Sequence, residues 1–248
     1  MIAPTFVWAH DLLSCVDHEN TVRMFDWAPV EQAARMVRYD ARGHGRAEAQ
    51  YVDRAYRWSA LVDDMIRAPG EGPFVGGGIG MGAATALSAA VRAPRRLAAL
   101  VLVAPPAGWQ WRYDRADEYE RLAQEVEQRG AVALAESWPV VGQPGFLTDR
   151  FDGPAELLTR HLFGMDPHAL PCILRGAALS DLASPDEVHE VIVPTLILAW
   201  DGDDGHPLCV AEELASLMIQ GELHVAEDRE ALARWPHLVR RFLADVTY

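Results

Sequence analysis

The sequence predicts an α/β protein whose parallel sheet is covered by helices on both faces, and three observations support this. Short apolar runs of strand length alternate with segments of helical periodicity along the 248 residues. The run 97–104 is apolar at every position, as in a parallel strand that is buried on both faces. A glycine-rich stretch at 76–82 joins a strand-like run to a helix of small residues. One large α/β domain accounts for the length.

The chain is acidic, with 36 Asp and Glu against 22 Lys and Arg and a formal net charge of -14. This balance argues against nucleic acid or an anionic membrane as partner, since both require basic patches. The three cysteines are scattered and none forms a C-x-x-C pair, which suits a reducing cytoplasm, where we expect the protein. No apolar run approaches 18 residues, so we expect no membrane span. The sequence predicts no metal site and no cofactor, and it leaves a homo-oligomer open.

The first half of the chain contains the strands and helices of a sheet protein, punctuated by glycine and proline. In order, the pattern predicts a strand at 5–9, helical spacing over 21–35 with a break at Pro29, a strand at 36–40, an amphipathic helix at 58–66, a strand entering the glycine-rich stretch, a helix to about 92 and the strand 97–104. Strands that alternate with helices in this way favour right-handed crossovers and a parallel sheet.

In the second half, the sequence pattern changes after Pro105-Pro106. Residues 107–190 contain no convincing buried strand, and helices are predicted at 118–129, 132–138, 155–163 and 168–179. The sheet pattern then resumes with a strand at 191–199, a helix at 210–218, a strand at 222–226 and a last helix around 238–242.

The glycine-rich stretch contains Gly78-Ile79-Gly80-Met81-Gly82 at the junction of strand and helix. This arrangement resembles the nucleophile elbow of the α/β-hydrolase superfamily, written G-x-S-x-G. The turn 40–45, with the pattern D-x-R-G-x-G, and the Val-Pro-Thr strand near 194 are similar to the same superfamily. The resemblance spans the chain. It implies an α/β-hydrolase fold with a mostly parallel sheet, a core made of 1–106 and 191–248, and a helical cap at 107–190 that covers the site.

The catalytic triad of that superfamily is Ser, then Asp or Glu, then His. Gly80 stands in the nucleophile position and has no side chain, while Asp203 matches the acid position. The loop after the last strand, where relatives carry the histidine, has none at 227–232. The G-x-G-x-G elbow is similar to that of the N-myc downstream-regulated group, which is regarded as non-hydrolytic. Losing nucleophile or base lowers the rate of a serine hydrolase by roughly 10⁶-fold, so ordinary ester hydrolysis is not expected.

The pocket itself is predicted from the loop after the first strand. His10-Asp11-Leu12 stand where relatives usually carry His-Gly, in a loop that donates a backbone N–H to the oxyanion hole. A carboxylate at Asp11 would repel an anion there unless it points away. The N–H of Met81 at the helix start would favour a carbonyl or carboxylate ligand. Trp109, with Trp111 and Trp138, is expected to line the cap or its core.

Two functional hypotheses follow. In the first, the protein binds a small apolar, carbonyl or carboxylate ligand between core and cap. In the second, it is a lyase, isomerase or cyclase that uses His10, His44 or His206 with Asp203 for proton transfer. A true ester or lactone hydrolase with an unrecognised nucleophile remains a lesser alternative. Cys15, in the loop after the first strand, is a candidate by position, but a small buried cysteine is the favoured interpretation of it. The pattern 78–83 also fits G-x-G-x-x-G/A, but the next strand ends without the acidic residue that a dinucleotide site requires.

Overall fold

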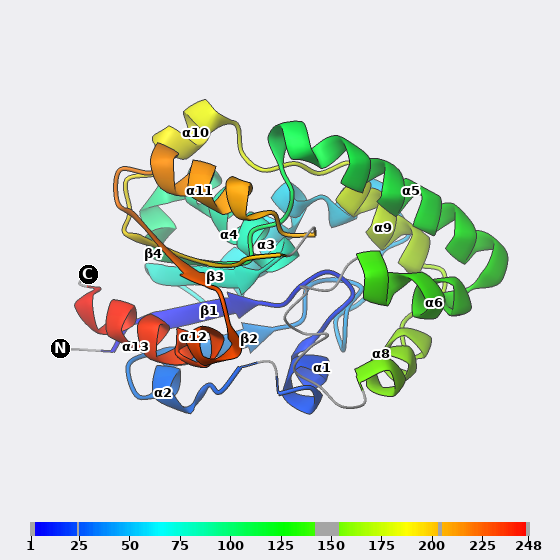
Figure 1. The fold of residues 1–248 in the computed structure, drawn as a ribbon, viewed down its shortest axis with the longest axis horizontal. Coiled ribbons are helices and arrows are strands. Elements are labelled where there is room, and N and C mark those ends of the chain that lie inside the picture. Colours follow the sequence, from blue (N-terminus) through cyan, green and yellow to red (C-terminus); the bar gives the residue numbers. More distant parts are fainter. Residues whose placement is uncertain (1–2, 24, 142–153, 203–204, 247–248) are drawn as a thin grey trace.

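Six parallel strands form the centre of the molecule (Figure 1). The computed structural model describes residues 3–23, 25–141, 154–202 and 205–246, without the side chains of 138–141 and 154–156. Within these residues the strand order is β2-β1-β3-β4-β5-β6, and every adjacent pair is parallel. The strands are β1 (Thr5–Ala9), β2 (Arg35–Tyr39), β3 (Phe74–Ile79), β4 (Leu97–Val103), β5 (Thr195–Trp200) and β6 (Gly221–Ala226). The predicted parallel sheet is confirmed.

The sheet separates two hydrophobic cores, because successive side chains of a strand point to opposite faces. In β4, Leu100 and Leu102 belong to one core, while Val101 and Val103 belong to the other. The first core is covered by α3 (Trp58–Arg67), α4 (Met81–Arg92) and α11 (Leu208–Leu217), and the second by α2 (Ala28–Glu31), α12 (Arg229–Ala233) and α13 (Trp235–Asp245). The continuous apolar run of β4 is explained by burial on both sides.

Five helices of the described chain lie between β4 and β5; four correspond to helices that the sequence predicts within 107–190, and the last of the five is not predicted. They are α5 (Arg112–Arg129), α6 (Ala131–Val141), α8 (Pro154–Phe163), α9 (Leu170–Ala178) and α10 (Pro185–His189). In Figure 1, α5, α6, α8 and α9 gather at the right, beyond the end of the sheet, whereas α10 lies beside α11. The division into a core and a separate cap remains a prediction. None of the described helices combines the length and apolarity that crossing a bilayer requires.

The expected helix over 21–35 is wrong. The chain instead forms α1 (Val16–Thr21), a loop, and the short α2. The aromatic residues that suggested a helical stripe form a cluster on Trp8 of β1, with Phe25 at 5.4 Å and Trp27 at 4.8 Å between ring centroids. Their spacing therefore reflects packing of a loop around one indole. Pro29 belongs to the first turn of α2 rather than to a break.

Candidate functional site

The glycine turn, residues 78–82, carries the chain from β3 into α4 at the carboxyl end of the sheet. Gly80 has φ 52° and ψ -114°, a backbone conformation that side chains disfavour, and α4 begins at the next residue. A Cβ on Gly82 would lie 2.1 Å from the backbone oxygen of Ala9. The turn therefore presses directly against the end of β1, which brings the loop after β1 to the same place.

The side chain of Asp11 points toward the glycine turn. Its Oδ1 accepts a hydrogen bond from the backbone N–H of Leu12 at 2.7 Å and from that of Met81 at 3.0 Å. We refer to these two donors as the N–H pair. A Cβ on Gly80 would stand 1.9 Å from the same Oδ1. The carboxylate thus occupies both the N–H pair and the space of a side chain at position 80.

This orientation corrects the expectation that the Met81 N–H would be open to a carbonyl or carboxylate ligand. The N–H donates to Asp11 instead, so an external oxygen would have to displace a carboxylate that is only 7 % exposed. The reason is geometric: the missing side chain at Gly80 leaves room for Asp11, and the N–H pair supplies hydrogen bonds to hold it.

His10 and His44 hold the loop that carries Asp11. In His10, Nδ1–H donates to the backbone oxygen of Asp11 at 2.7 Å, and Nε2 accepts from Ala41 N–H at 3.0 Å. In His44, Nδ1–H donates to the backbone oxygen of Arg42 at 2.9 Å, and Nε2 accepts from Leu13 N–H at 3.3 Å. Because one nitrogen of each ring accepts from a backbone N–H, both rings are neutral.

Burial favours the same neutral state. It lowers the pKa of His10 to about 4 and that of His44 to about 3, and the charged form of His10, whose ring lies 5.0 Å away, adds to the lowering of the pKa of His44. Both residues are 1 % exposed. Acid–base work by His44 or His10 would therefore require breaking a backbone hydrogen bond, and the geometry supports a positioning role.

A third histidine reaches the same loop from α8. His161 Nε2–H donates to the backbone oxygen of Leu13 at 2.9 Å, which leaves its Nδ1 as an acceptor 4.0 Å from Cys15 Sγ. The ring of His18 stacks on His161 at 4.3 Å. The Cys15 sulfur also accepts from the His18 N–H and caps α1, and burial raises the pKa of this thiol. Sequence reasoning did not single out His161, because nothing in the spacing of α8 shows which loop it faces.

The loop after β5, which contains the predicted acid position, lies only partly within the described residues. Asp203 lies outside the described residues, so its role as the acid remains a prediction. His206 is buried, and the neighbouring Gly205 accepts from Ala107 N–H at 3.3 Å, which ties the loop after β5 to the loop after β4. His206 therefore lies in a loop at the carboxyl ends of the strands, the end of the sheet that also carries the glycine turn. Its acid–base role remains a prediction.

The structure describes some of the tryptophans that are predicted to line the cap or its core. Trp109 donates through its backbone N–H to Asp181 at 2.9 Å and through Nε1 to the backbone oxygen of Ala183 at 2.9 Å. It has φ 54°, an uncommon value for a residue with a side chain, and packs with Trp111 against the larger core. These contacts anchor the chain after β4. Contact of Trp109 with a ligand remains a prediction, and the side chain of Trp138 lies outside the described residues.

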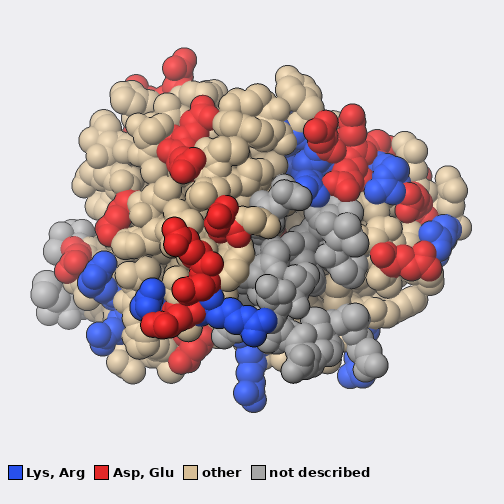
Figure 2. Space-filling model, in the orientation of Figure 1, with Lys and Arg blue, Asp and Glu red and all other residues tan. Residues whose placement is uncertain are grey.

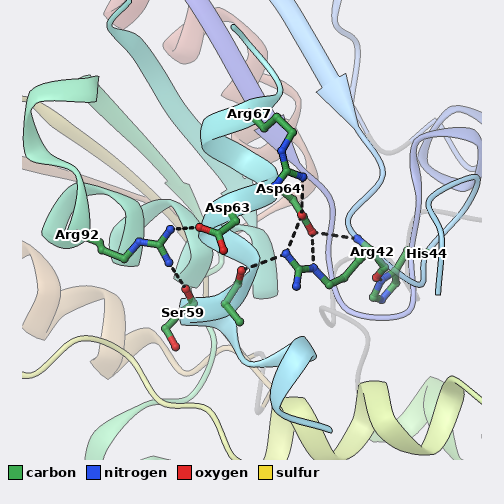
Figure 3. Close-up of polar contacts among 8 residues, drawn as sticks. Arg42, His44, Ser59, Asp63, Asp64, Arg67 and Arg92 are labelled. Atoms are coloured by element: carbon green, nitrogen blue, oxygen red, sulfur yellow. Dashed lines mark hydrogen bonds and ion pairs between the residues drawn. The ribbon is translucent and has the colours of Figure 1, made fainter. Parts of the chain in front are cut away.

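Polar contacts anchor the turn 40–45, and Figure 3 shows those between Arg42 and Asp64. Asp40 accepts from the backbone N–H groups of Val16 at 2.8 Å and Arg46 at 2.9 Å. Arg42 pairs with Asp64 of α3 rather than with Asp40, through Nε at 2.9 Å and Nη2 at 2.8 Å. These bonds fix the turn that presents His44 to the loop carrying Asp11.

Among the hollows of the described surface, two lie away from the glycine turn. One, of about 730 Å³, lies between α2 and α13, and the other, of about 580 Å³, lies between the end of β2 and α3. Neither is lined by Asp11 or Gly80. Acidic side chains are spread over the face shown in Figure 2, with opposite charges interspersed near α5. No cluster of His, Cys, Asp and Glu suited to a metal ion occurs among the described residues.

Comparison with known proteins decides the family. Residues 18–150 match the family model described as "Serine aminopeptidase, S33", which is more than half of the chain. The chain belongs to this family. Its fold is accordingly that of the α/β hydrolases, with the glycine turn in the region that the match covers. No curated protein sequence matches the chain.

Solved structures agree on the fold. The enol-lactonase from Burkholderia xenovorans LB400 aligns with a TM-score of 0.81 and 19 % identity, covering 99 % of this chain and 93 % of that one. A malate-bound thermophilic esterase from Thermogutta terrifontis aligns at 0.79 and 22 %, covering 100 % and 92 %. A hydrolase from Pseudomonas aeruginosa PA01 aligns at 0.74 and 19 %, covering 96 % and 88 %. At such identities the likeness establishes the α/β-hydrolase fold and not the reaction.

Proposed function

We propose that this α/β-hydrolase-fold protein binds a small, largely apolar ligand between core and cap and does not carry out ordinary ester hydrolysis. One observation carries the proposal. The carboxylate of Asp11 lies where the side chain of a nucleophile at position 80 would stand, and it accepts both bonds of the N–H pair. An oxyanion forming there would meet a carboxylate in place of two donors, so the transition state of acyl transfer would be disfavoured.

The histidines near Asp11 add support. Serine hydrolysis needs a base within hydrogen-bond reach of the nucleophile. His10 and His44 hold the loop that carries Asp11. Each ring uses both of its nitrogens in hydrogen bonds with backbone groups. The same observation weighs against a lyase or isomerase in which either ring moves a proton.

The proposal predicts that the purified protein shows no turnover of p-nitrophenyl esters above buffer. Small lactones belong in the same panel, since similar folds include an enol-lactonase and an esterase. Turnover is followed by release of nitrophenolate and by pH-stat titration. Saturable hydrolysis that Asp203→Asn abolishes would refute the proposal, because it would show a working acid and a nucleophile elsewhere.

A second candidate function rests on Cys15. Its Sγ lies 4.0 Å from the acceptor nitrogen of His161, and Leu13 orients that ring through its backbone oxygen. A thiol, a base and a group that orients the base are the parts of a cysteine nucleophile. If the panel shows turnover, loss in Cys15→Ser with retention in Cys209→Ser would assign the activity to this pair. Cys209, at the start of α11, is the matched control.

A further inference from the structure

The larger of the two hollows described above is basic, although the protein as a whole is acidic. We call it the α2/α13 hollow, because it lies between the end of α2 and α13, and its volume is about 730 Å³. Arg234, Arg240 and Arg241 line it together with one acidic residue, Asp245, so an excess of positive charge remains. In the whole chain, acidic residues outnumber basic ones by 36 to 22. Figure 2 shows basic side chains over α13, at the left of the molecule.

The amphipathic character of α13 explains why these arginines face outward. Trp235, Val239 and Leu243, spaced by four residues, are buried in the core that α2 also covers. The arginines are exposed on the other sides of the helix. Across the hollow, the end of α2 contributes Gln32 and Ala33, neither of which carries a charge. The positive charge of the arginines is therefore not balanced from the α2 side.

The guanidinium groups are available to a ligand. Among the described residues, Arg240 has no ion-pair partner. Arg234 pairs with Glu230 at 3.0 Å. Arg241 lies 3.9 Å from Glu222. The four side chains of these two pairs are more than half exposed, and exposed pairs contribute little to stability, so a ligand oxyanion can replace either carboxylate.

The remaining lining of the α2/α13 hollow suits an apolar group. Ala33, Leu238 and Ala244 contribute aliphatic side chains to it. The volume falls within the range of small-molecule sites, about 300–1,000 Å³. The planar guanidinium group matches the geometry of carboxylate and phosphate, to which it donates two parallel hydrogen bonds. The hollow therefore combines donors for an oxyanion with a wall for hydrocarbon.

The α2/α13 hollow is separate from the glycine turn. Gln32 and Ala33 precede β2, so they lie toward the amino ends of the parallel strands. The glycine turn follows β3 and lies at the carboxyl ends. In Figure 1, α2 and α13 lie at the lower left, on the side where the chain ends are marked. Binding in this hollow is independent of the function proposed for the site beside Gly80.

We propose that the α2/α13 hollow binds a small amphipathic anion, an alkyl or aryl group that carries one phosphate or carboxylate. Arg234, Arg240 and Arg241 hold the anionic group, and the aliphatic wall covers the hydrocarbon. The proposal goes beyond the function proposed above, because it concerns a second site toward the opposite end of the sheet.

The test compares four probes in titrations of the ¹⁵N-labelled full chain: hexyl phosphate, hexanoate, inorganic phosphate and hexylammonium. The titrations are made at low ionic strength, where charges are weakly screened, and follow the backbone amides of Ala33, Leu238 and Ala244. We expect at least one of the two amphipathic anions to bind saturably, about tenfold or more tighter than hexylammonium, with shifts centred on these amides. Inorganic phosphate, which lacks the hydrocarbon, should bind about fivefold or more weaker than hexyl phosphate. The tighter of hexyl phosphate and hexanoate identifies the anionic group.

Substitution of the unpaired arginine tests the site itself. Arg240→Gln should weaken the tighter anion about fivefold, since one contact between exposed charges is lost. Arg95→Gln is the matched control, because Arg95 is exposed, lies outside the hollow and gives the same change in net charge. The control should change the affinity less than about twofold.

Four results would each overturn the proposal. They are absence of saturable anion binding, equal binding of hexylammonium, inorganic phosphate binding as tightly as hexyl phosphate, and equal weakening by Arg240→Gln and Arg95→Gln. Shifts centred on Gly80 and Met81 would also overturn it, since the anion would then bind at the other end of the sheet. The comparison of probes uses the wild type alone, so it holds even if a variant fails to fold. Ester turnover would refute the function proposed above and leave this site unaffected.

Discussion

At the scale of single residues, Gly80 and Asp11 form a matched pair. Position 80 has a backbone conformation that side chains disfavour, and a side chain there would collide with the Asp11 carboxylate. Neither residue explains the site by itself: the glycine creates the space, and the aspartate fills it with a charge that the N–H pair stabilises. We therefore expect that introducing serine at position 80 alone does not produce a hydrolase.

We predict that Gly80→Ser destabilises the fold by about 3 kcal/mol, of which backbone strain accounts for about 1–2 and displacement of Asp11 for the rest. The measurement is urea unfolding of the single variants and of Gly80→Ser/Asp11→Gly in a double-mutant cycle. Removing Asp11 should recover at least about 1 kcal/mol of the cost.

Gly70→Ser serves as the control for strain alone, since Gly70 has φ 81° and nothing within 4 Å of its Cβ position. Gly70→Ser should lower the free energy of unfolding only by the cost of backbone strain, about 1–2 kcal/mol. Additive effects of Gly80→Ser and Asp11→Gly, within about 0.5 kcal/mol, would show that the two positions do not compete for space.

At the scale of elements, three histidines from different parts of the chain bind the loop that follows β1. His10 holds Asp11, while His44 and His161 hold the N–H and the C=O of Leu13. Leu13 has φ 55°, and such a strained residue persists only where its surroundings determine its conformation. Two of these rings, His10 and His44, must stay neutral, because each accepts a hydrogen bond from a backbone N–H.

This arrangement predicts an acid-sensitive fold. Burial holds the pKa of His10 at about 4 and that of His44 at about 3, below the ordinary value of 6.5. The unfolded chain therefore binds more protons than the native state once the pH falls below about 6.5. Each histidine should cost about 2 kcal/mol of unfolding free energy between pH 6.5 and pH 5. Stability is full above pH 6.5 and declines as the pH approaches 4.

The check is urea unfolding as a function of pH for the wild type and for His44→Gln, which cannot be protonated. The variant should show a shallower loss between pH 6.5 and pH 5. His237→Gln, on the exposed side of α13, should leave the profile unchanged. Parallel profiles for the wild type and His44→Gln would disprove the role assigned to the buried ring.

At the scale of the whole molecule, one sheet joins two cores into a single unit. The central β4 contributes Leu102 to the larger core and Val103 to the other, so a defect on either face weakens the same strand. The site lies at the carboxyl ends of β1 and β3, where the crossover connections of a parallel sheet bring loops together.

We expect Leu102→Ala to lower the free energy of unfolding by about 2–5 kcal/mol, because the side chain is fully buried and leaves a cavity. Unfolding should remain a single transition with an unchanged urea m-value. Leu179→Ala, whose side chain is 53 % exposed, should stay within about 0.5 kcal/mol of the wild type. Two separate transitions in Leu102→Ala would contradict the view that the cores unfold together.

By itself, the sequence determined the parallel sheet, the order of most helices, the glycine turn and the absence of a side chain at Gly80. Apolar periodicity and glycine patterns report local backbone and burial, which are what these features depend on. The error over 21–35 arose because aromatic residues packing on Trp8 imitate helical spacing. Only the tertiary structure decided where Asp11 points and which histidines hold its loop. Those facts depend on the approach of β1, the glycine turn and α8, which are distant in the chain, and no local pattern records such contacts.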